Sequence, residues 1–266
     1  MKGIILAGGT ATRLFPLTAT TSKQLLPIYD RQMIFYPLNT LLKAGIKDIL
    51  IIVAPEHSGQ FLNLLGSIFK KHGVNLYFEV QKTPRGLADA FIVGESFIDN
   101  DSVTMILGDN IYEDDLSPAI KKFKKGGMIF VKGVPDPQRF GIAEFDKKDK
   151  VISIEEKPQQ PKSNYCVTGL YVYDNRVAKI AKNLTPSVRG EIEITDLNNQ
   201  YLAMGELVAQ KIKGEWLDAG TFDSLLEASN IVKNKKLYKK FDPMVDKAIA
   251  EFNEELKGIA KKKLVG

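Results

Sequence analysis

Four apolar runs of strand length alternate with helical patterns between residues 2 and 107, and this alternation constrains the fold more than any other feature. The runs cover Lys2–Leu6, Asp48–Val53, Asn75–Val80 and Val103–Leu107. Their β-branched and aromatic residues are typical of strands in a buried sheet. Strands that alternate with helices form right-handed crossover units. The sequence therefore predicts an α/β fold with a mostly parallel sheet.

The rest of the chain adds shorter strands and then returns to helices. The expected helices are Met33–Ala44, His57–Lys71, Leu87–Glu95, Arg176–Leu184, Ile194–Met204 and Phe222–Lys233. The later expected strands are Met128–Val134, Phe140–Phe145, Val151–Glu155, Val167–Tyr173 and Leu207–Ile212. We expect residues 1–233 to form one catalytic domain and residues 234–266 to form a C-terminal amphipathic helical extension.

The extension begins with Asp242 and Pro243, a typical helix start. Its apolar stripe must be buried on its own core or on a partner subunit, and packing on its own core is the favoured interpretation. The stripe consists of Val245, Ala248, Ile249, Phe252, Leu256 and Ile259.

Composition excludes several classes of protein. No apolar run is long enough for a membrane span, and the N-terminus lacks the pattern of a signal peptide. The single cysteine, Cys166, excludes an internal disulfide and favours the reducing cytoplasm. The net charge of +5 suits a protein that binds an anionic substrate, or it could reflect a lysine-rich tail. Because no nucleic-acid-binding motif accompanies this charge, we expect neither a nucleic acid nor a membrane as partner.

The first strand ends in a glycine turn, Gly8-Gly9-Thr10-Ala11-Thr12-Arg13. Two glycines let the backbone approach a ligand closely, and the free N–H groups of such a turn can hold phosphate oxygens. Arg13 offers a fork of donors to the same oxygens. The alternative is an ordinary turn with a solvated arginine.

Two aspartates follow apolar segments beside glycine, Asp109 and Asp218. Mg²⁺ takes few protein oxygens and completes its shell with phosphate and water, so two carboxylates and a polyphosphate suffice for a magnesium site. Taken singly, each aspartate could be a turn or cap residue. Together with the glycine turn they favour a metal site.

Cations and one amide complete the candidate residues. Lys23, Lys157 and Arg189 would neutralise phosphates if they converged on one cleft, although single surface cations are usually solvated. Gln81 follows a strand and offers the paired donor and acceptor that a pyrimidine edge needs, or else is a surface amide. Neither a nucleophilic serine motif nor a reactive cysteine signature is present, so covalent catalysis is not indicated.

The motifs of this chain, in their order, resemble those of the glucose-1-phosphate thymidylyltransferases, a group of sugar-phosphate nucleotidyltransferases. The resemblance runs from about Met1 to Asn230. It rests on GIILAGGTATRLFPLT, SKQLLPIYD, GLADAF, LGDNI, RFGIAEFD, EEKP, SNYCVTGLYVYD, RGEIEITD and WLDAGTFDSLLEAS. It implies a mixed, mostly parallel Rossmann-like sheet with helices on both faces, in a nucleotidyltransferase (glycosyltransferase-A-like) architecture. It also implies Mg²⁺-dependent transfer of a nucleotide to a sugar 1-phosphate with release of pyrophosphate, and a homo-oligomer.

The resemblance also implies a role for each candidate residue. Gly8, Gly9, Thr12 and Arg13 would hold the triphosphate, and Lys23 the departing pyrophosphate. Gln81 and Gly86 would recognise the pyrimidine, and Asp109 and Asp218 would hold Mg²⁺. Asn110, Gly141, Glu156, Val167 and Tyr171 would line the sugar pocket, and Lys157 and Arg189 would bind the sugar phosphate.

The chain departs from the family pattern at three places. Ala11 stands where the family's loop usually has glycine, and we expect it to adopt an ordinary backbone conformation. Phe140 replaces a common tyrosine and so loses a hydroxyl. The tail after Lys233 is shorter than in longer members, where this region contributes to subunit contacts and to a second nucleotide site.

The resulting prediction is an enzyme that makes dTDP-glucose from dTTP and glucose 1-phosphate. Use of UTP or of another hexose 1-phosphate is the alternative within the same class, because discrimination by one methyl contact is worth only about 1 kcal/mol. From a different class, the chain could be a catalytically inactive regulator that binds sugar nucleotides. A lysine-tail interaction module would instead bind nucleic acid in a salt-sensitive way.

Overall fold

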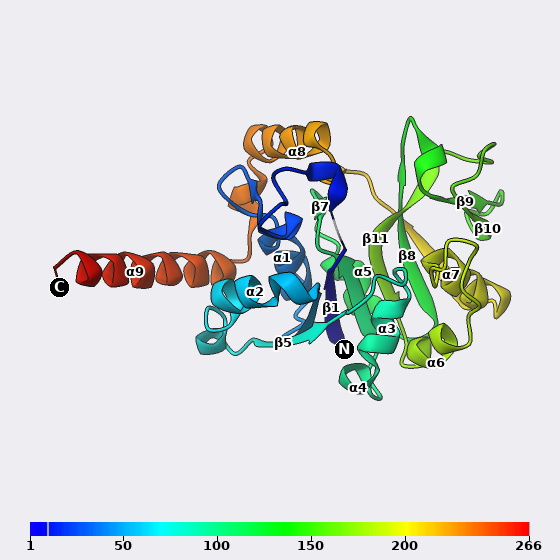
Figure 1. The fold of residues 1–266 in the computed structure, drawn as a ribbon. Helices are drawn as coiled ribbons and strands as arrows, with labels where there is room; N and C mark the ends of the chain where they lie inside the picture. Colours follow the sequence, from blue (N-terminus) through cyan, green and yellow to red (C-terminus); the bar gives the residue numbers. More distant parts are fainter. Residues whose placement is uncertain (10, 266) are drawn as a thin grey trace.

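The computed structural model describes residues 1–9 and 11–265, and within them a sheet of nine strands forms the centre of the molecule (Figure 1). The strands are β1 Lys2–Ala7, β4 Asp48–Val53, β5 Asn75–Val80, β6 Val103–Leu107, β8 Gly127–Gly133, β9 Gly141–Phe145, β10 Val151–Glu156, β11 Tyr165–Tyr173 and β12 Leu207–Lys211. Their order is β10-β9-β11-β6-β1-β4-β5, with β8 between β11 and β12. The pairs among β6, β1, β4 and β5 are parallel, whereas β11 is antiparallel to β6. The expected mixed α/β sheet is confirmed, and its first four long strands are all parallel.

Helices cover both faces of this sheet. They are α1 Phe35–Lys43, α2 Ser58–Leu65, α3 Asp89–Val93, α4 Glu95–Ile98, α5 Ser117–Lys122, α6 Val177–Lys182, α7 Ile194–Ala203, α8 Phe222–Asn234 and α9 Pro243–Val265. Alternate side chains of a strand point to opposite faces. Ile5 therefore packs in a core shared with α1 and α2, while Ile4 packs in a second core shared with α3, α6 and α7.

Two short antiparallel ladders lie outside the main sheet. One joins β2 Pro27–Ile28 to β3 Arg31–Gln32. The other joins β7 Asn110–Tyr112 to β13 Trp216–Asp218. The second ladder brings the end of the parallel sheet together with a segment from late in the chain, and it places two expected site residues side by side.

Two expected helices are shorter or interrupted, both times at a glycine. The helix expected over His57–Lys71 ends at Leu65, because Gly66 is a poor helix former and Ile68 and Phe69 turn into the core. The helix expected over Leu87–Glu95 is divided into α3 and α4 at Gly94. A Cβ there would lie 3.0 Å from Ile4 Cδ1, so glycine allows this segment to approach the sheet.

The C-terminal helix α9 begins as expected, since Asp242 Oδ1 accepts a 2.9 Å hydrogen bond from the Met244 N–H. Val245 and Ala248 are buried in the core that also contains α1 side chains, so the first turns pack on the chain's own core. The far end of α9 extends away from the body (Figure 1). The expected stripe residues Leu256 and Ile259 have side chains outside the described part. No helix in residues 1–9 and 11–265 has both the length and the apolar character needed to cross a membrane.

Candidate active site

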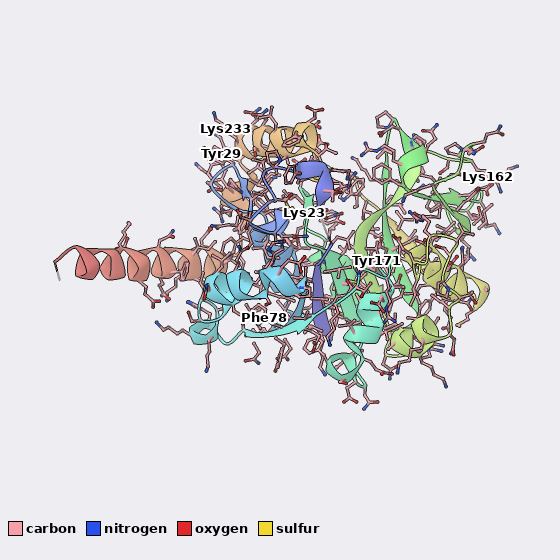
Figure 2. The ribbon with its side chains drawn as sticks, viewed as in Figure 1. Lys23, Tyr29, Phe78, Lys162, Tyr171 and Lys233 are labelled. Carbon is pink, nitrogen blue, oxygen red and sulfur yellow. The ribbon has the colours of Figure 1, made fainter. Side chains whose placement is uncertain are left out.

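A cleft of about 290 Å³ lies between the ends of β6, β9, β10 and β11 and the β7–β13 ladder. Tyr171, from β11, lies in its wall (Figure 2). The expected site residues that line the cleft are Arg13, Asp109, Asn110, Gly141, Glu156, Lys157, Val167, Tyr171 and Asp218. Motifs spread over much of the chain thus meet in one place.

Asp109 and Asp218 are brought together by the β7–β13 ladder. Asp218 is the register partner of Asn110, the residue after Asp109. The backbone continues the pairing, because the Ala219 N–H donates a 3.2 Å hydrogen bond to the Asp109 carbonyl oxygen. The two carboxylates expected to hold a metal therefore lie next to each other at one end of the cleft.

The two carboxylates have different electrostatic surroundings. The Lys23 ammonium (Figure 2) forms an ion pair with Asp109, and Asn110 Nδ2 donates to Asp109 Oδ1 at 2.9 Å. Burial alone would raise the pKa of Asp109, but Lys23 outweighs it and holds this pKa below its ordinary value. Burial and the Asp109 charge raise the pKa of Asp218 to about 6, against the opposing charge of Lys23. Asp218 therefore holds a proton more tightly than an ordinary aspartate does, although Arg13 and Arg139 also lower its pKa.

This chemistry fits a divalent cation such as Mg²⁺. Nowhere in the described ranges do three or more His, Cys, Asp or Glu side chains gather as a metal cluster, so a cage made of protein ligands alone is not formed there. Mg²⁺ needs only one or two carboxylates when phosphate oxygens and water complete its shell. Asp109 and Asp218 could supply those two carboxylates, and a shared cation would relieve their mutual repulsion.

Arg13 lies over the same pair. A Cβ on Gly220 would be 2.9 Å from Arg13 Nη2 and 3.1 Å from Asp218 Oδ1, so both side chains occupy the space above this glycine. Arg13 follows the glycine turn directly, in a short 3-10 turn over Thr12–Leu14. Its guanidinium therefore connects the turn with the aspartate pair.

The glycine turn differs from expectation at Ala11. This residue has φ 45° and ψ 34°, the left-handed conformation that disfavours any residue with a Cβ. The expectation of an ordinary backbone conformation is wrong, because the turn reverses at Ala11 before entering the 3-10 turn. Gly9 has φ 95° and Thr12 is exposed, while Thr10 lies outside the described residues. The turn thus places two left-handed residues beside the site.

Asn110 lines the cleft, but the polar atoms of its side chain are hydrogen-bonded to other residues of the protein. Its Oδ1 accepts hydrogen bonds from Trp216 Nε1 at 2.6 Å and from the Gly169 N–H at 3.0 Å. A Cβ on Gly169 would lie 2.6 Å from that oxygen, so only glycine leaves room for it. Since its Nδ2–H donates to Asp109 Oδ1, Asn110 holds the Asp109 carboxylate in place.

The opposite wall is organised around Glu156. Its Oε2 accepts a 2.6 Å hydrogen bond from Thr195 Oγ1, and its Oε1 lies 3.5 Å from Arg189 Nη2 and 3.7 Å from Lys157 Nζ. Arg189 also donates to Glu193 Oε1 at 2.9 Å. Arg189 therefore does not line the cleft itself and lies one side chain behind it, paired with Glu156, Glu191 and Glu193.

Gln81 and Gly86 lie on the other side of the glycine turn. A Cβ on Gly8 would be 3.2 Å from Gln81 Oε1, so the amide lies beside the start of the turn. Gly86 has φ 97°, and a Cβ there would be 2.4 Å from the Ile192 carbonyl oxygen. Of the two expected pyrimidine residues, Gln81 thus lies beside Gly8, whereas Gly86 packs against the Ile192 backbone.

Several cleft residues were not singled out from the sequence. Trp216 and Arg139 open two of the motifs quoted above, so a signal was present, but their roles depend on partners distant in sequence. Trp216 packs edge-on against Phe140 with ring centroids 5.4 Å apart. The remaining additional lining residues are Leu87, Leu107, Thr168, Gly169, Ile194 and Thr195.

Comparison with known proteins places this geometry in a family. A family model described as nucleotidyl transferase matches residues 2–235. The glucose-1-phosphate thymidylyltransferase of Neisseria meningitidis serogroup A is 52% identical over 240 residues, which is 88% of this chain and 83% of that protein. The enzyme of the same name from Mycolicibacterium smegmatis is 50% identical over 242 residues, 89% of this chain and 84% of that protein.

Solved structures agree with this placement. A Bacillus anthracis crystal structure, described as a glucose-1-phosphate thymidylyltransferase in complex with sucrose, has a TM-score of 0.82 and 46% identity, covering 87% of this chain and 94% of its own. A UDP-glucose pyrophosphorylase complexed with UDP-glucose shares the fold, with a TM-score of 0.77 and 24% identity over 88% of this chain and 98% of its own. The chain belongs to the nucleotidyl transferase family, among its glucose-1-phosphate thymidylyltransferases.

Proposed function

We propose that this protein joins glucose 1-phosphate to dTTP and releases dTDP-glucose and pyrophosphate, with Mg²⁺ held by Asp109 and Asp218. The observation that carries the proposal is the β7–β13 ladder, which sets the buried Asp109 and the half-buried Asp218 side by side at the end of the cleft. The names of relatives that are about half identical to this chain supply the substrates.

The geometry supports a division of the site into three parts. Gly8, Gly9, Thr12 and Arg13 would bind the triphosphate, with Lys23 receiving the departing pyrophosphate. Gln81 and Gly86 would bind the base. Asn110, Gly141, Glu156, Val167 and Tyr171 would shape the sugar pocket, and Lys157 would bind the sugar phosphate. Arg189 would join Lys157 only by turning from its glutamate partners into the cleft.

The reaction is an attack by a phosphate oxygen of glucose 1-phosphate on the α-phosphorus of dTTP, in line with the departing pyrophosphate. The attacking oxygen is already an anion, so the chain needs to supply no general base. The obstacle is the repulsion between two polyanions and their alignment. Arg13, Lys23 and Lys157 offset that repulsion and orient the phosphates. A bound Mg²⁺ supplies further positive charge to the phosphate oxygens.

Lys23 must change partners during this cycle. It is paired with Asp109 in this structure, and the same carboxylate would hold Mg²⁺. With Asp109 engaged by a metal ion, the Lys23 ammonium would be free to bind phosphate oxygens.

A catalytically inactive sugar-nucleotide regulator remains the alternative from another class. An inactive protein would be expected to have lost the metal carboxylates or the phosphate-binding cations. The site gives that alternative no support, because the carboxylate pair and the cations Arg13, Lys23 and Lys157 are all present. Within the enzyme class, the choice of dTTP over UTP and of glucose over other hexoses is the finer part of the proposal.

The test is a pyrophosphate-release assay that crosses dTTP, UTP, CTP and ATP with the 1-phosphates of glucose, glucosamine and galactose. We expect the highest kcat/KM for dTTP with glucose 1-phosphate, loss of release with EDTA and recovery with Mg²⁺. If no pair of substrates gave pyrophosphate release, the enzyme proposal would be wrong and the inactive regulator would be favoured. A higher kcat/KM for another pair would correct the substrates alone.

Organisation and location complete the proposal. Residues 1–233 would form the catalytic part and residues 234–266 its extension, in a homo-oligomer that works in the cytoplasm. Removal of residues 253–266, which keeps the buried turns of α9, would leave turnover intact and separate catalysis from assembly. Sedimentation of the full chain and of this variant measures the assembly.

A further inference from the structure

A buried chain of hydrogen bonds runs from Arg85 through Asp89 to Gln81. Asp89 Oδ1 accepts a 2.7 Å hydrogen bond from Arg85 Nη2, and Oδ2 accepts a 2.7 Å hydrogen bond from Gln81 Nε2. Asp89 is only 1% exposed and Gln81 is 8% exposed, while the Arg85 side chain is 55% exposed. Asp89 therefore has one oxygen for each partner and is closed to solvent.

The chemistry of Asp89 decides which way the Gln81 amide points. A carboxylate accepts hydrogen bonds and donates none. The group of Gln81 that faces Asp89 must therefore be its NH₂, and the amide oxygen must lie on the other side. The Gln81 main chain is held as well, because its N–H donates to the Val53 carbonyl oxygen at 3.0 Å.

The amide oxygen of Gln81 points toward the glycine turn. A Cβ on Gly8 would lie 3.2 Å from Oε1, so the missing side chain keeps the space in front of this oxygen open. Across residues 1–9 and 11–265, no group donates a hydrogen bond to Oε1. Gln81 therefore presents its amide oxygen as an acceptor beside Gly8, while its NH₂ group is held on the Asp89 side.

We propose that Asp89 is a positioning residue that locks the Gln81 amide with its oxygen toward the base and thereby selects thymine or uracil over cytosine. The inference rests on the proposed function, in which Gln81 binds the base. Thymine and uracil carry an N3–H donor at their pairing edge, whereas cytosine carries a bare N3 acceptor. An amide oxygen pairs with the first and leaves the second without a partner, which a buried polar site tolerates poorly.

The substitution Asp89→Asn tests this lock with little change of shape. Arg85 would keep the side-chain oxygen of the new residue, so its NH₂ group would face Gln81. The Gln81 amide would then turn over, accept from that NH₂ and present its own NH₂ to the base. The variant is expected to favour a base with an acceptor at N3.

The measurement is kcat/KM at saturating glucose 1-phosphate for two nucleotide pairs, dTTP against dCTP and UTP against CTP. Each ratio should fall by at least about tenfold in Asp89→Asn, since one correctly paired base edge is worth about that much discrimination. Loss of stability alone would lower both members of a pair and leave the ratio unchanged. A ratio within about twofold of the wild-type value in a folded Asp89→Asn variant would overturn the proposal.

A double variant provides a rescue. In Gln81→Glu combined with Asp89→Asn, the negative charge moves from residue 89 to residue 81 and the net charge is kept. The glutamate can accept from the asparagine with one oxygen and still present the other to the base. We expect both ratios to return to within about threefold of the wild-type values, and a failure to recover would contradict the lock.

Asp246→Asn is the matched control, because Asp246 also pairs with an arginine, Arg31 at 2.9 Å, and lies on α9 outside the cleft. Its ratios should equal the wild-type ratios. If Asp89→Asn does not fold, Asp89→Ser takes its place, and its hydroxyl would let the Gln81 amide adopt both orientations and lower the ratios several-fold. Unchanged ratios in that folded variant would again overturn the lock.

Failure of the proposed function is recognised separately. If the wild-type protein releases no pyrophosphate with any nucleotide, the proposed reaction is wrong. Calorimetric binding of dTTP and dCTP to the same variants then tests the lock, and the ratio of the two Kd values should change as predicted for kcat/KM. Equal effects on both Kd values would reject the lock independently of turnover.

Discussion

Trp216 Nε1 donates a 2.6 Å hydrogen bond to Oδ1 of Asn110, across 106 positions of sequence. Asn110 in turn donates to Asp109, which is paired with Lys23. A single line of polar contacts thus runs from the wall of the cleft to the expected metal site. Each member of this line fixes the orientation of the next.

The first prediction concerns Trp216→Phe. The new ring would still pack against Phe140, but the donor to Asn110 would be lost. We expect kcat/KM for glucose 1-phosphate to fall about tenfold, corresponding to one buried hydrogen bond of about 1–1.5 kcal/mol. Steady-state kinetics checks this, with Tyr77→Phe as a control at an exposed aromatic outside the cleft. Unchanged kinetics would show that the remaining partners of Asn110 hold its amide without Trp216.

The second prediction separates stability from activity at Asp218. Asp218→Asn would remove a carboxylate whose pKa is raised by burial and by Asp109, so the repulsion between the two residues would disappear. We expect Tm to stay equal or rise, while turnover falls by at least about 100-fold because one metal ligand is lost. Asp109→Asn should lose turnover as well but lower Tm, because Lys23 would lose its partner. Near-normal turnover in both variants would reject the assigned roles.

The sequence alone could predict the long strands of this fold. Asp48–Val53, Asn75–Val80 and Val103–Leu107 coincide with β4, β5 and β6, because an apolar run bounded by turn residues is a local signal. The β7–β13 ladder could not be predicted in this way. Three-residue strands carry no measurable periodicity, and their pairing depends on contacts between distant parts of the chain.

The candidate site also has features that the sequence predicts and features that only the folded structure reveals. Its charged and glycine residues were found because a phosphate site requires those residue types. The role of Trp216, the place of Arg189 behind Glu156 and the contact of Asp89 with Gln81 depend on the folded arrangement. At Ala11 the residue type argues against a left-handed backbone, and the glycine usual at this position in the family was the one signal for it.

The third prediction follows from Ala11. Its φ of 45° costs an alanine about 1–2 kcal/mol, and glycine removes most of this cost while adding chain entropy in the unfolded state. We expect Ala11→Gly to raise the free energy of unfolding by up to about 1 kcal/mol, or Tm by about 2–4 °C. Thermal unfolding measures the effect. A lower Tm would show that the lower unfolded-state entropy of a chain with alanine outweighs the backbone strain at residue 11.

The fourth prediction is a pH dependence at Asp174. Burial alone would raise the pKa of this carboxyl, but hydrogen bonds from Arg176, the Gly126 N–H and Tyr201 outweigh it and lower the pKa. A lowered pKa means that the carboxylate stabilises the fold fully above its unfolded pKa of about 3.9, and that this contribution is lost as the pH falls through the lower folded pKa.

Asp174→Asn should therefore reduce the free energy of unfolding by about 1–3 kcal/mol at neutral pH. The difference from the wild type should narrow as the pH is lowered from about 5 to about 3. Urea unfolding at several pH values measures it. A difference that stays constant over this range would assign the effect to packing and not to the charge.

The β7–β13 ladder also determines when this protein can become active as it is made. A growing chain that has reached β12 already contains the glycine turn, the parallel strands and one of the two carboxylates. It lacks Asp218 and the strand that sets this residue beside Asn110. Partial chains can therefore carry much of the expected phosphate-binding surface without a complete reaction centre, and the ability to react comes only once synthesis has entered the last fifth of the sequence.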